Sequence, residues 1–210
     1  MDVPAHLTQP VAFARARGAH RFEVFSPKLK RRLTLDRRCA VDQWFVLESD
    51  PTVRVFCERP GFAQFDGRRY LIDFHVRYAD RQELLLLPDP VIVEDGNPRS
   101  VVDASAMTVR HVEHAELVAS RIWVDNWQRM LPCLIATRGL VPASLLNSIE
   151  CFVATSQSLL DIEREFSTGD PIVVRAALFG LLHTGRVTAP ELRTEPLSWL
   201  TRFAAAEVRS

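Results

Sequence analysis

The chain has 210 residues, balances 26 acidic against 26 basic side chains, and is 47% hydrophobic. This length allows one large domain or two small ones with a buried core. No apolar run reaches the roughly 18 residues that a membrane helix needs, which argues against a membrane-spanning protein. The N-terminal segment lacks the apolar core of a signal peptide, so we expect a cytoplasmic protein without a membrane partner. The four cysteines form no Cys-x-x-Cys pair, which argues against structural zinc and a disulfide framework.

Positive charge is concentrated near the N-terminus. Residues 1–40 hold nine basic and three acidic side chains. Such asymmetry favours contact with nucleic acid more than the overall charge of zero would suggest, because lysine and arginine neutralise phosphates. We therefore predict DNA contacts by six side chains: Lys28, Lys30, Arg31, Arg32, Arg37 and Arg38. The alternative is a solvated basic arm, which the charge count alone does not separate from a DNA contact.

The first quarter of the chain predicts an arm, a strand, a loop and a helix. Residues 1–20 show no period and contain two prolines, so we expect a poorly ordered arm. Residues 20–26 alternate briefly, as a short strand does. Residues 26–32 have the composition of a loop that carries basic groups to solvent. Residues 36–48 present a wide apolar face and predict a helix, which Asp50-Pro51 ends because the residue before proline disfavours helical backbone.

The next segments predict a meander of strands. Residues 53–58 alternate apolar and polar side chains, as a half-buried strand does. Asp66-Gly67 lies between two apolar runs and is a strong hairpin signal. Residues 73–78 continue as a strand. The leucine-rich run at residues 83–87 suits a central strand covered on both faces, and residues 91–93 form a further short strand. Together with the preceding helix, these strands predict an α/β core with a mixed sheet.

The second half has mainly helical patterns. We expect helices over residues 112–135, with a break or kink at Pro132, and over 141–154, 156–166 and 171–183. Two short extended pieces should follow, at residues 186–190 and 192–197. Three short helices with a strand pair are typical of a winged helix. Residues 100–112 fit no single pattern, and we place the domain boundary near residues 96–112, giving an N-terminal domain of residues 1–100 and a helical domain of residues 101–210.

A series of short motifs begins at residue 26. It comprises Ser26-Pro27 before the basic patch, a helix running into Asp50-Pro51, Glu58-x-Pro60, Gly67-Arg68-Arg69, and Asp73-Phe74-x-Val76. In order and spacing the series resembles the TnsA-type endonuclease subunits of heteromeric cut-and-paste transposases, and the C-terminal segments extend the resemblance over most of the chain. The resemblance implies a restriction-endonuclease-like N-terminal domain and a winged-helix-like C-terminal domain. It also implies a role in DNA transposition beside a transposase subunit and an AAA+ ATPase regulator.

The nucleases of this family need three catalytic groups, and this chain keeps one. A helix glutamate, the aspartate of the Asp-Phe step and a carboxylate-x-lysine strand hold magnesium and activate water for phosphodiester hydrolysis. Counted from the fixed motifs, the helix glutamate falls on Ala40, and the strand pair falls near Leu86 and Pro88. Asp73 is then a vestigial catalytic residue. We predict a pseudo-nuclease with no metal site and no cofactor.

Other chemistry-bearing side chains have plainer interpretations. His75 shares a strand face with Asp73 and could replace a lost ligand, but a lone histidine on a strand is more often a core or surface group. His111 and His114 have ligand spacing, yet no third histidine is near, and a solvated helix face is favoured. Core or interface packing is favoured over base stacking for two tryptophans spaced four residues apart, Trp123 and Trp127.

Three functions are therefore open. The first is a catalytically degenerate, TnsA-like protein that binds DNA and partner proteins in a transposition complex. The second is an active Mg²⁺-dependent DNA endonuclease whose ligands have migrated to Asp42, Glu58, Asp73 and Glu83, with Asp36 or Asp42 standing in for the helix glutamate. The third is a regulatory or interaction protein that keeps the fold and does not bind DNA. We favour the first.

Overall fold

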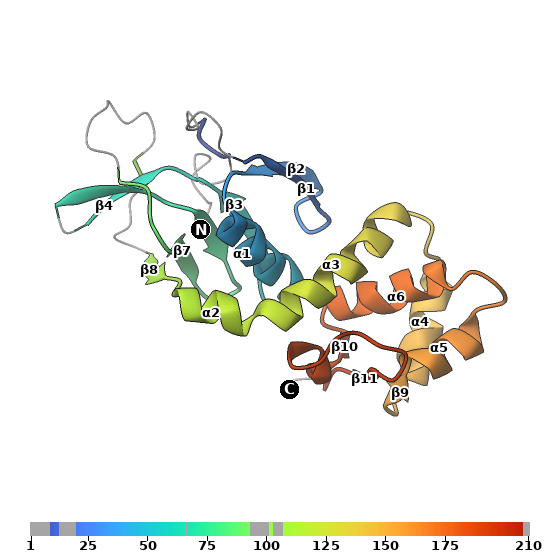
Figure 1. The fold of residues 1–210 in the computed structure, drawn as a ribbon. Coiled ribbons are helices and arrows are strands. Elements are labelled where there is room, and N and C mark those ends of the chain that lie inside the picture. The colour runs from blue at the N-terminus through green and yellow to red at the C-terminus, as the bar shows by residue number, and fades with distance from the viewer. Residues whose placement is uncertain (1–8, 13–19, 66, 93–100, 103–106, 208–210) are drawn as a thin grey trace. The chain divides into compact units, whose positions relative to one another are not determined.

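The structure is a mixed α/β fold with several small sheets and, in the part of the chain described, six α-helices (Figure 1). It is a computed structural model that describes residues 9–12, 20–65, 67–92, 101–102 and 107–207. Contacts divide the chain into two compact units, Met1–Leu47 with Thr52–Ala119 and Glu48–Pro51 with Ser120–Ser210. The expected arm lies mostly, and the expected boundary near residues 96–112 lies partly, outside the described residues. Among those residues, no helix combines the length and apolar character needed to cross a membrane.

The first unit contains eight strands and two helices among its described residues. In chain order they are β1 (Phe22–Ser26), β2 (Arg31–Leu35), α1 (Arg38–Ser49), β3 (Val55–Glu58), β4 (Phe62–Phe65), β5 (Arg68–Leu71), β6 (Phe74–Arg77), β7 (Gln82–Leu86), β8 (Thr108–His111) and α2 (His114–Ala119). The predicted helix before Asp50-Pro51 and the strands predicted at residues 53–58, 73–78 and 83–87 are confirmed, with small shifts at their ends.

The central sheet of this unit has the strand order β3-β6-β7-β8. β3, β6 and β7 pair antiparallel, and β7 pairs parallel with β8, so the sheet is mixed. The leucine run forms β7, which has a partner on both edges, and Leu84 to Leu87 are at most 2% exposed. A continuous apolar strand is what such a position requires, since both of its faces are covered. The prediction of a central, covered strand is confirmed.

The hairpin predicted at Asp66-Gly67 forms as β4 and β5, but as a separate two-stranded sheet. Gly67 has a φ of +71°, a conformation that glycine adopts without steric cost. Ala63 of this hairpin packs with Leu84 and Leu86 in a buried cluster. The hairpin therefore covers one face of the central sheet instead of extending the meander.

The basic segment at residues 26–32 is not the predicted solvent loop. Only residues 27–30 turn, and the chain then returns as β2, which pairs antiparallel with β1. The hydroxyl of Ser26 accepts a hydrogen bond from the amide of Leu29 (3.0 Å) and closes the turn. Leu33 and Leu35 point into the core, so an alternating apolar pattern stabilises β2. Because Arg31 and Arg32 precede these leucines, the sequence indicated a charged loop and not the start of a strand.

Residues 100–112 and the helix after them also differ from expectation. Residues 108–111 form β8, and the single helix predicted over residues 112–135 is two helices, α2 and α3 (Arg121–Ala136), that separate at Ser120. Pro132 does not break α3, which continues for four residues beyond it. Proline removes one hydrogen bond to the preceding turn, and the helix continues through the hydrogen bonds of its other residues.

The second unit combines four helices with three very short strands among its described residues. Its elements are α3, α4 (Ala143–Phe152), β9 (Gln157–Ser158), α5 (Leu159–Phe166), α6 (Ile172–His183), β10 (Val187–Thr188), the 3-10 helix η2 (Pro190–Arg193) and β11 (Arg202–Ala205). The strands form an antiparallel sheet of order β10-β11-β9. The helices predicted at residues 141–154, 156–166 and 171–183 are confirmed. The extended piece predicted at residues 192–197 is wrong, because η2 occupies its start and the third strand comes later.

Buried Asn126 in α3 holds the segment that was expected to be extended. Its amide nitrogen donates to the carbonyl oxygens of Leu192 and Glu195 (both 2.8 Å), and its oxygen accepts from the amide of Leu197 (2.7 Å). One side chain thus satisfies three backbone groups of residues 192–197. This explains why the segment is held against α3 without pairing as a strand.

We predict that Asn126→Ala lowers the free energy of unfolding by about 2 kcal/mol, because two carbonyls and one amide lose a buried side-chain partner. Urea unfolding measures the change. The matched control is Asn147→Ala on the exposed face of α4, which should change the value by less than about 0.5 kcal/mol. Equal effects of the two substitutions would contradict an anchoring role for Asn126.

Candidate functional site at one end of the central sheet

Three adjacent strands bring Glu58, Asp73 and Leu87 to the same end of the central sheet. The register pairs Glu58 at the end of β3 with Phe74 at the start of β6, and Phe74 with Leu85 near the end of β7. The backbone continues this pairing, since the amide of Arg59 donates to the carbonyl of Asp73 (2.8 Å) and the amide of Asp73 donates to that of Leu85 (3.0 Å). This end of the sheet is where the sequence predicted the remains of a nuclease centre.

Both carboxylate oxygens of Asp73 have protein partners. Oδ2 accepts the amide of Leu87 (2.8 Å), and Oδ1 forms an ion pair with the guanidinium of Arg37. Arg37 also donates to the carbonyl oxygens of Pro88 (3.1 Å) and Asp89 (2.8 Å). Asp73 and Arg37 thus join the start of α1, the start of β6 and the end of β7. Burial raises the pKa of Asp73, while Arg37 and the amide of Leu87 oppose part of that rise.

The two positions at which the resemblance would place the other catalytic groups hold apolar side chains. Arg37 immediately precedes α1, and Ala40, one turn later on the same helix face, is buried. Leu86 at the end of β7 is fully buried, and Pro88 follows the strand. Magnesium requires several oxygen ligands in octahedral geometry. A single carboxylate with both oxygens engaged does not fit that ion.

Glu58 ends the strand next to Asp73, but the proposed migrated ligands form no metal-binding cluster around Asp73 among the described residues. Asp42 pairs with Arg38 on the surface of α1 (3.0 Å). Glu83 pairs with Arg81 (2.8 Å) and lies opposite Val76, three residues along β6 from Asp73, which is about 10 Å of strand. In the described part of the chain, no three histidine, cysteine, aspartate or glutamate side chains lie close enough to hold a metal ion.

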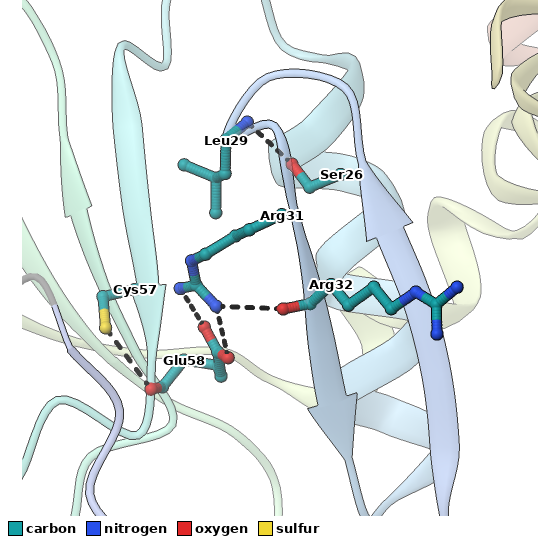
Figure 2. A network of polar contacts seen from close by, with 6 residues as sticks. All are labelled: Ser26, Leu29, Arg31, Arg32, Cys57 and Glu58. Atoms are coloured by element: carbon teal, nitrogen blue, oxygen red, sulfur yellow. Dashed lines mark hydrogen bonds and ion pairs between the residues drawn. The ribbon is translucent and has the colours of Figure 1, made fainter.

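Glu58 is bound by an arginine from the opposite hairpin. Figure 2 shows the guanidinium of Arg31, on β2, facing the carboxylate of Glu58 as two parallel contacts of 2.8 and 2.5 Å. The Glu58 side chain is only 3% exposed. Two-pronged pairing of this kind is the strongest geometry that arginine and a carboxylate form. Glu58 therefore attaches the β1–β2 hairpin to the end of β3.

Cys57 lies beside this ion pair, and its thiol contacts the carbonyl of Glu58 (3.5 Å, Figure 2). Burial, followed by the neighbouring charge of Glu58, raises the pKa of the Cys57 thiol to about 12. Alkylation requires the thiolate. We predict that iodoacetamide at pH 8 modifies the exposed Cys151 and spares Cys57 in the folded protein, as mass spectrometry of the digested protein would show. Rapid labelling of Cys57 before unfolding would contradict this geometry.

Four of the six basic residues predicted to contact DNA are engaged inside the first unit. Arg31 and Arg37 hold the two carboxylates, Arg38 pairs with Asp42, and the ammonium of Lys28 donates to the carbonyl of Leu47 (2.9 Å) in the last turn of α1. The remaining two, Lys30 and Arg32, have exposed side chains with no ion-pair partner among the described residues. Figure 2 shows the side chain of Arg32 extending away from the Arg31–Glu58 pair.

Arg59 is a cation at this end of the sheet that the sequence did not reveal. Its φ is +45°, in the left-handed region that residues with a side chain rarely adopt. Its carbonyl accepts the amide of Val11 (2.8 Å), and its buried Nε atom has no hydrogen-bond partner among the described residues. Nothing in the residue pattern marks a positive φ at an arginine, so only the structure could identify it.

The remaining candidates have structural roles. His75 is buried and its Nε2 contacts the side-chain oxygen of Gln82 (2.9 Å), which is the plainer interpretation of a lone histidine on a strand. His111 ends β8 and His114 begins α2, and no third metal-binding side chain lies in reach among the described residues. Trp123 and Trp127 are buried and pack edge to face, which fits core packing and leaves no ring face for a base.

Comparison with models of known protein families and with curated proteins found no match.

Proposed function

We propose that the chain is a TnsA-like, non-catalytic subunit of a DNA transposition complex that contributes DNA binding and protein contacts. The first unit supports a restriction-endonuclease-like fold, because a helix precedes three antiparallel strands and the last of them pairs with a parallel fourth strand. An aspartate at the start of the second strand, Asp73, occupies the position expected of a metal ligand in that fold.

The observation that supports loss of catalysis is the use made of Asp73. Its two oxygens bind Arg37 and the amide of Leu87. The guanidinium supplies the positive charge that a metal ion would supply in a nuclease, but it neither binds nor activates water. Ala40 and Leu86 provide no further ligand. The carboxylate of a former reaction centre then serves as a joint between α1 and the central sheet.

The second unit supports a winged-helix-like arrangement used for protein contact. Its elements follow the order α4-β9-α5-α6-β10-β11, with a three-stranded sheet behind three helices. In DNA-binding winged helices the last of the three helices presents polar groups to a groove. Here α6 is largely buried, and its one arginine, Arg175, pairs with Glu163 (2.5 Å). This helix supports the core of the unit and leaves DNA contact to the first unit.

DNA contact is best supported for the β1–β2 hairpin, through Lys30 and Arg32. Phosphate contacts make affinity depend on salt and not on sequence. We predict that Lys30→Ala/Arg32→Ala weakens binding to duplex DNA and reduces the slope of log K against log salt by about 2, since each phosphate contact contributes about 0.9. Fluorescence anisotropy across a salt series measures this. Arg121→Ala/Arg164→Ala, which removes two exposed charges from the second unit, is the control and should leave the slope unchanged.

One experiment separates the three functions. The purified protein is incubated with DNA and Mg²⁺ or Mn²⁺, and in parallel is co-expressed with the transposase subunit and the AAA+ ATPase regulator of a heteromeric transposon. Co-purification and salt-dependent DNA binding without cleavage are the expected results. Cleavage that Asp73→Asn abolishes would establish the nuclease with migrated ligands instead. Partner binding without any salt-dependent DNA binding would establish the regulatory protein.

A further inference from the structure

A cavity in the second unit is bordered by an exposed tryptophan and an exposed arginine. Its volume is about 440 Å³, and it lies between α3, α5, α6 and the turn at residues 198–201. Buried Leu159 and Phe179 form its apolar wall. Trp199 and Leu200 lie beside it with 51% and 74% of their surface exposed. Large apolar side chains that remain exposed next to a concave surface mark an interaction site.

The turn that carries these side chains is held by hydrogen bonds on both sides. The amide of Thr201 donates to the carbonyl of Ser198 (3.1 Å), and the amide of Ser198 donates to the hydroxyl of Thr201 (2.9 Å). The amide of Leu160 donates to the carbonyl of Trp199 (3.0 Å). The guanidinium of Arg175, already paired with Glu163, lies 4.9 Å from the centre of the Trp199 ring. Trp199 is therefore positioned before a partner arrives, which reduces the entropy lost on binding.

The positive charge lining the cavity favours a partner with a negatively charged group. Two arginines line it, and no acidic residue is among the lining residues in the described part of the chain. Arg175 is neutralised by Glu163, but Arg129, exposed on α3, has no ion-pair partner among the described residues. Tryptophan and arginine are the side chains that most often dominate binding energy at interfaces. The positive charge of Arg129 favours a carboxylate on the bound segment, and the apolar wall favours a bulky apolar side chain.

We propose that this cavity binds a short segment of a partner protein in which an aspartate or glutamate stands beside a bulky apolar residue. The acidic side chain pairs with Arg129, and the apolar side chain enters the cavity against Phe179 and Trp199. The inference rests on the proposed protein-contact role of the second unit. It adds the binding surface and the chemistry of the segment bound.

The test is a selection of random peptides displayed on phage against the whole protein, followed by calorimetry with a synthetic peptide of the enriched sequence. Enriched peptides should pair an acidic with a bulky apolar residue. Arg129→Glu and Trp199→Ala should each weaken the peptide about tenfold or more. Two controls at exposed positions of the same unit, Arg164→Glu and Leu140→Ala, should bind it as the parent protein does. A peptide with its acidic residue replaced by lysine should regain affinity for Arg129→Glu.

Several results would overturn the proposal. One is enrichment of basic peptides, or of no peptide at all. Another is a peptide affinity of Arg129→Glu or Trp199→Ala equal to that of the parent protein. A third is self-association in sedimentation that Leu200→Ala abolishes, which would make a second copy of the chain the occupant. Co-purification with the transposition partners that persists in Arg129→Glu and Trp199→Ala would leave the proposed function standing and reject this surface alone.

Discussion

Asp73→Ala is expected to lower the free energy of unfolding by about 4 kcal/mol, the loss typical of breaking a buried ion pair from one side. The substitution leaves the guanidinium of Arg37 without its carboxylate and the amide of Leu87 without an acceptor. Both groups lie at the junction of α1 with the central sheet, so the loss affects the packing of two elements. Urea unfolding monitored by tryptophan fluorescence measures the change.

Two further variants serve as controls for the stability loss expected of Asp73→Ala. Asp80→Ala removes an exposed carboxylate from a surface ion pair and should cost less than about 0.5 kcal/mol. Arg37→Met/Asp73→Leu replaces the pair by apolar side chains and should recover most of the loss, because no buried charge is left unpaired. A double variant as unstable as Asp73→Ala would show that the ion pair is not the cause.

The pH dependence of this group has a definite sign. Because burial raises the pKa of Asp73, the folded protein holds this proton more firmly than the unfolded chain, whose aspartate titrates near about 3.9. The stability tied to the group is therefore complete below that pH and decreases as the pH rises through the folded value. Asp73→Asn cannot titrate and keeps one oxygen for the amide of Leu87. Its unfolding free energy should lack this slope from about pH 4 upward.

The same reasoning decides which variant tests for nuclease activity. Asp73→Ala would reduce any property of the protein simply by destabilising the fold. Asp73→Asn keeps an acceptor for the amide of Leu87 but also leaves the guanidinium of Arg37 without its carboxylate, so the cleavage assay is read beside the unfolding free energy of this variant. In a protein whose carboxylate is structural, DNA binding should persist in Asp73→Asn at the affinity of the parent.

Local patterns in the sequence predicted much of the backbone. Leucines 84–87 identified a strand covered on both faces, and Asp66-Gly67 identified a hairpin turn, because in each case the deciding interactions lie within a few residues. The counting of catalytic positions also depended only on local landmarks. Ala40 is buried on α1 and Leu86 is buried on β7, but that these are the former catalytic positions stays a prediction.

The basic segment shows that ion-pair partners far apart in the sequence could not be predicted from local patterns. Counting charges over residues 1–40 treated Arg31 and Arg37 as free for phosphate, but their carboxylates come from Glu58 and Asp73, 27 and 36 residues later. No pattern within a window of ten residues connects such partners. For the same reason Glu58 was considered as a metal ligand and not as the partner of Arg31. Sheet register, which only the fold provides, decided between these roles.

Glu58→Ala is expected to cost about 3 kcal/mol of unfolding free energy, because two charge-assisted hydrogen bonds to Arg31 are lost in a site where the carboxylate is almost fully buried. Arg31→Lys keeps the charge but cannot make both contacts and should lose about 1 kcal/mol.

A double-mutant cycle of Arg31→Ala and Glu58→Ala isolates the pair and should give a coupling of about 2 kcal/mol. The same cycle on Arg121 and Asp125, an exposed pair one helical turn apart, should give less than about 0.5 kcal/mol. If Glu58 were instead a migrated metal ligand, Mg²⁺ would raise the stability of the parent protein and not that of Glu58→Ala. Strong coupling to Arg31 together with indifference to Mg²⁺ would show that this carboxylate fastens the β1–β2 hairpin, and with it Lys30 and Arg32, to the central sheet.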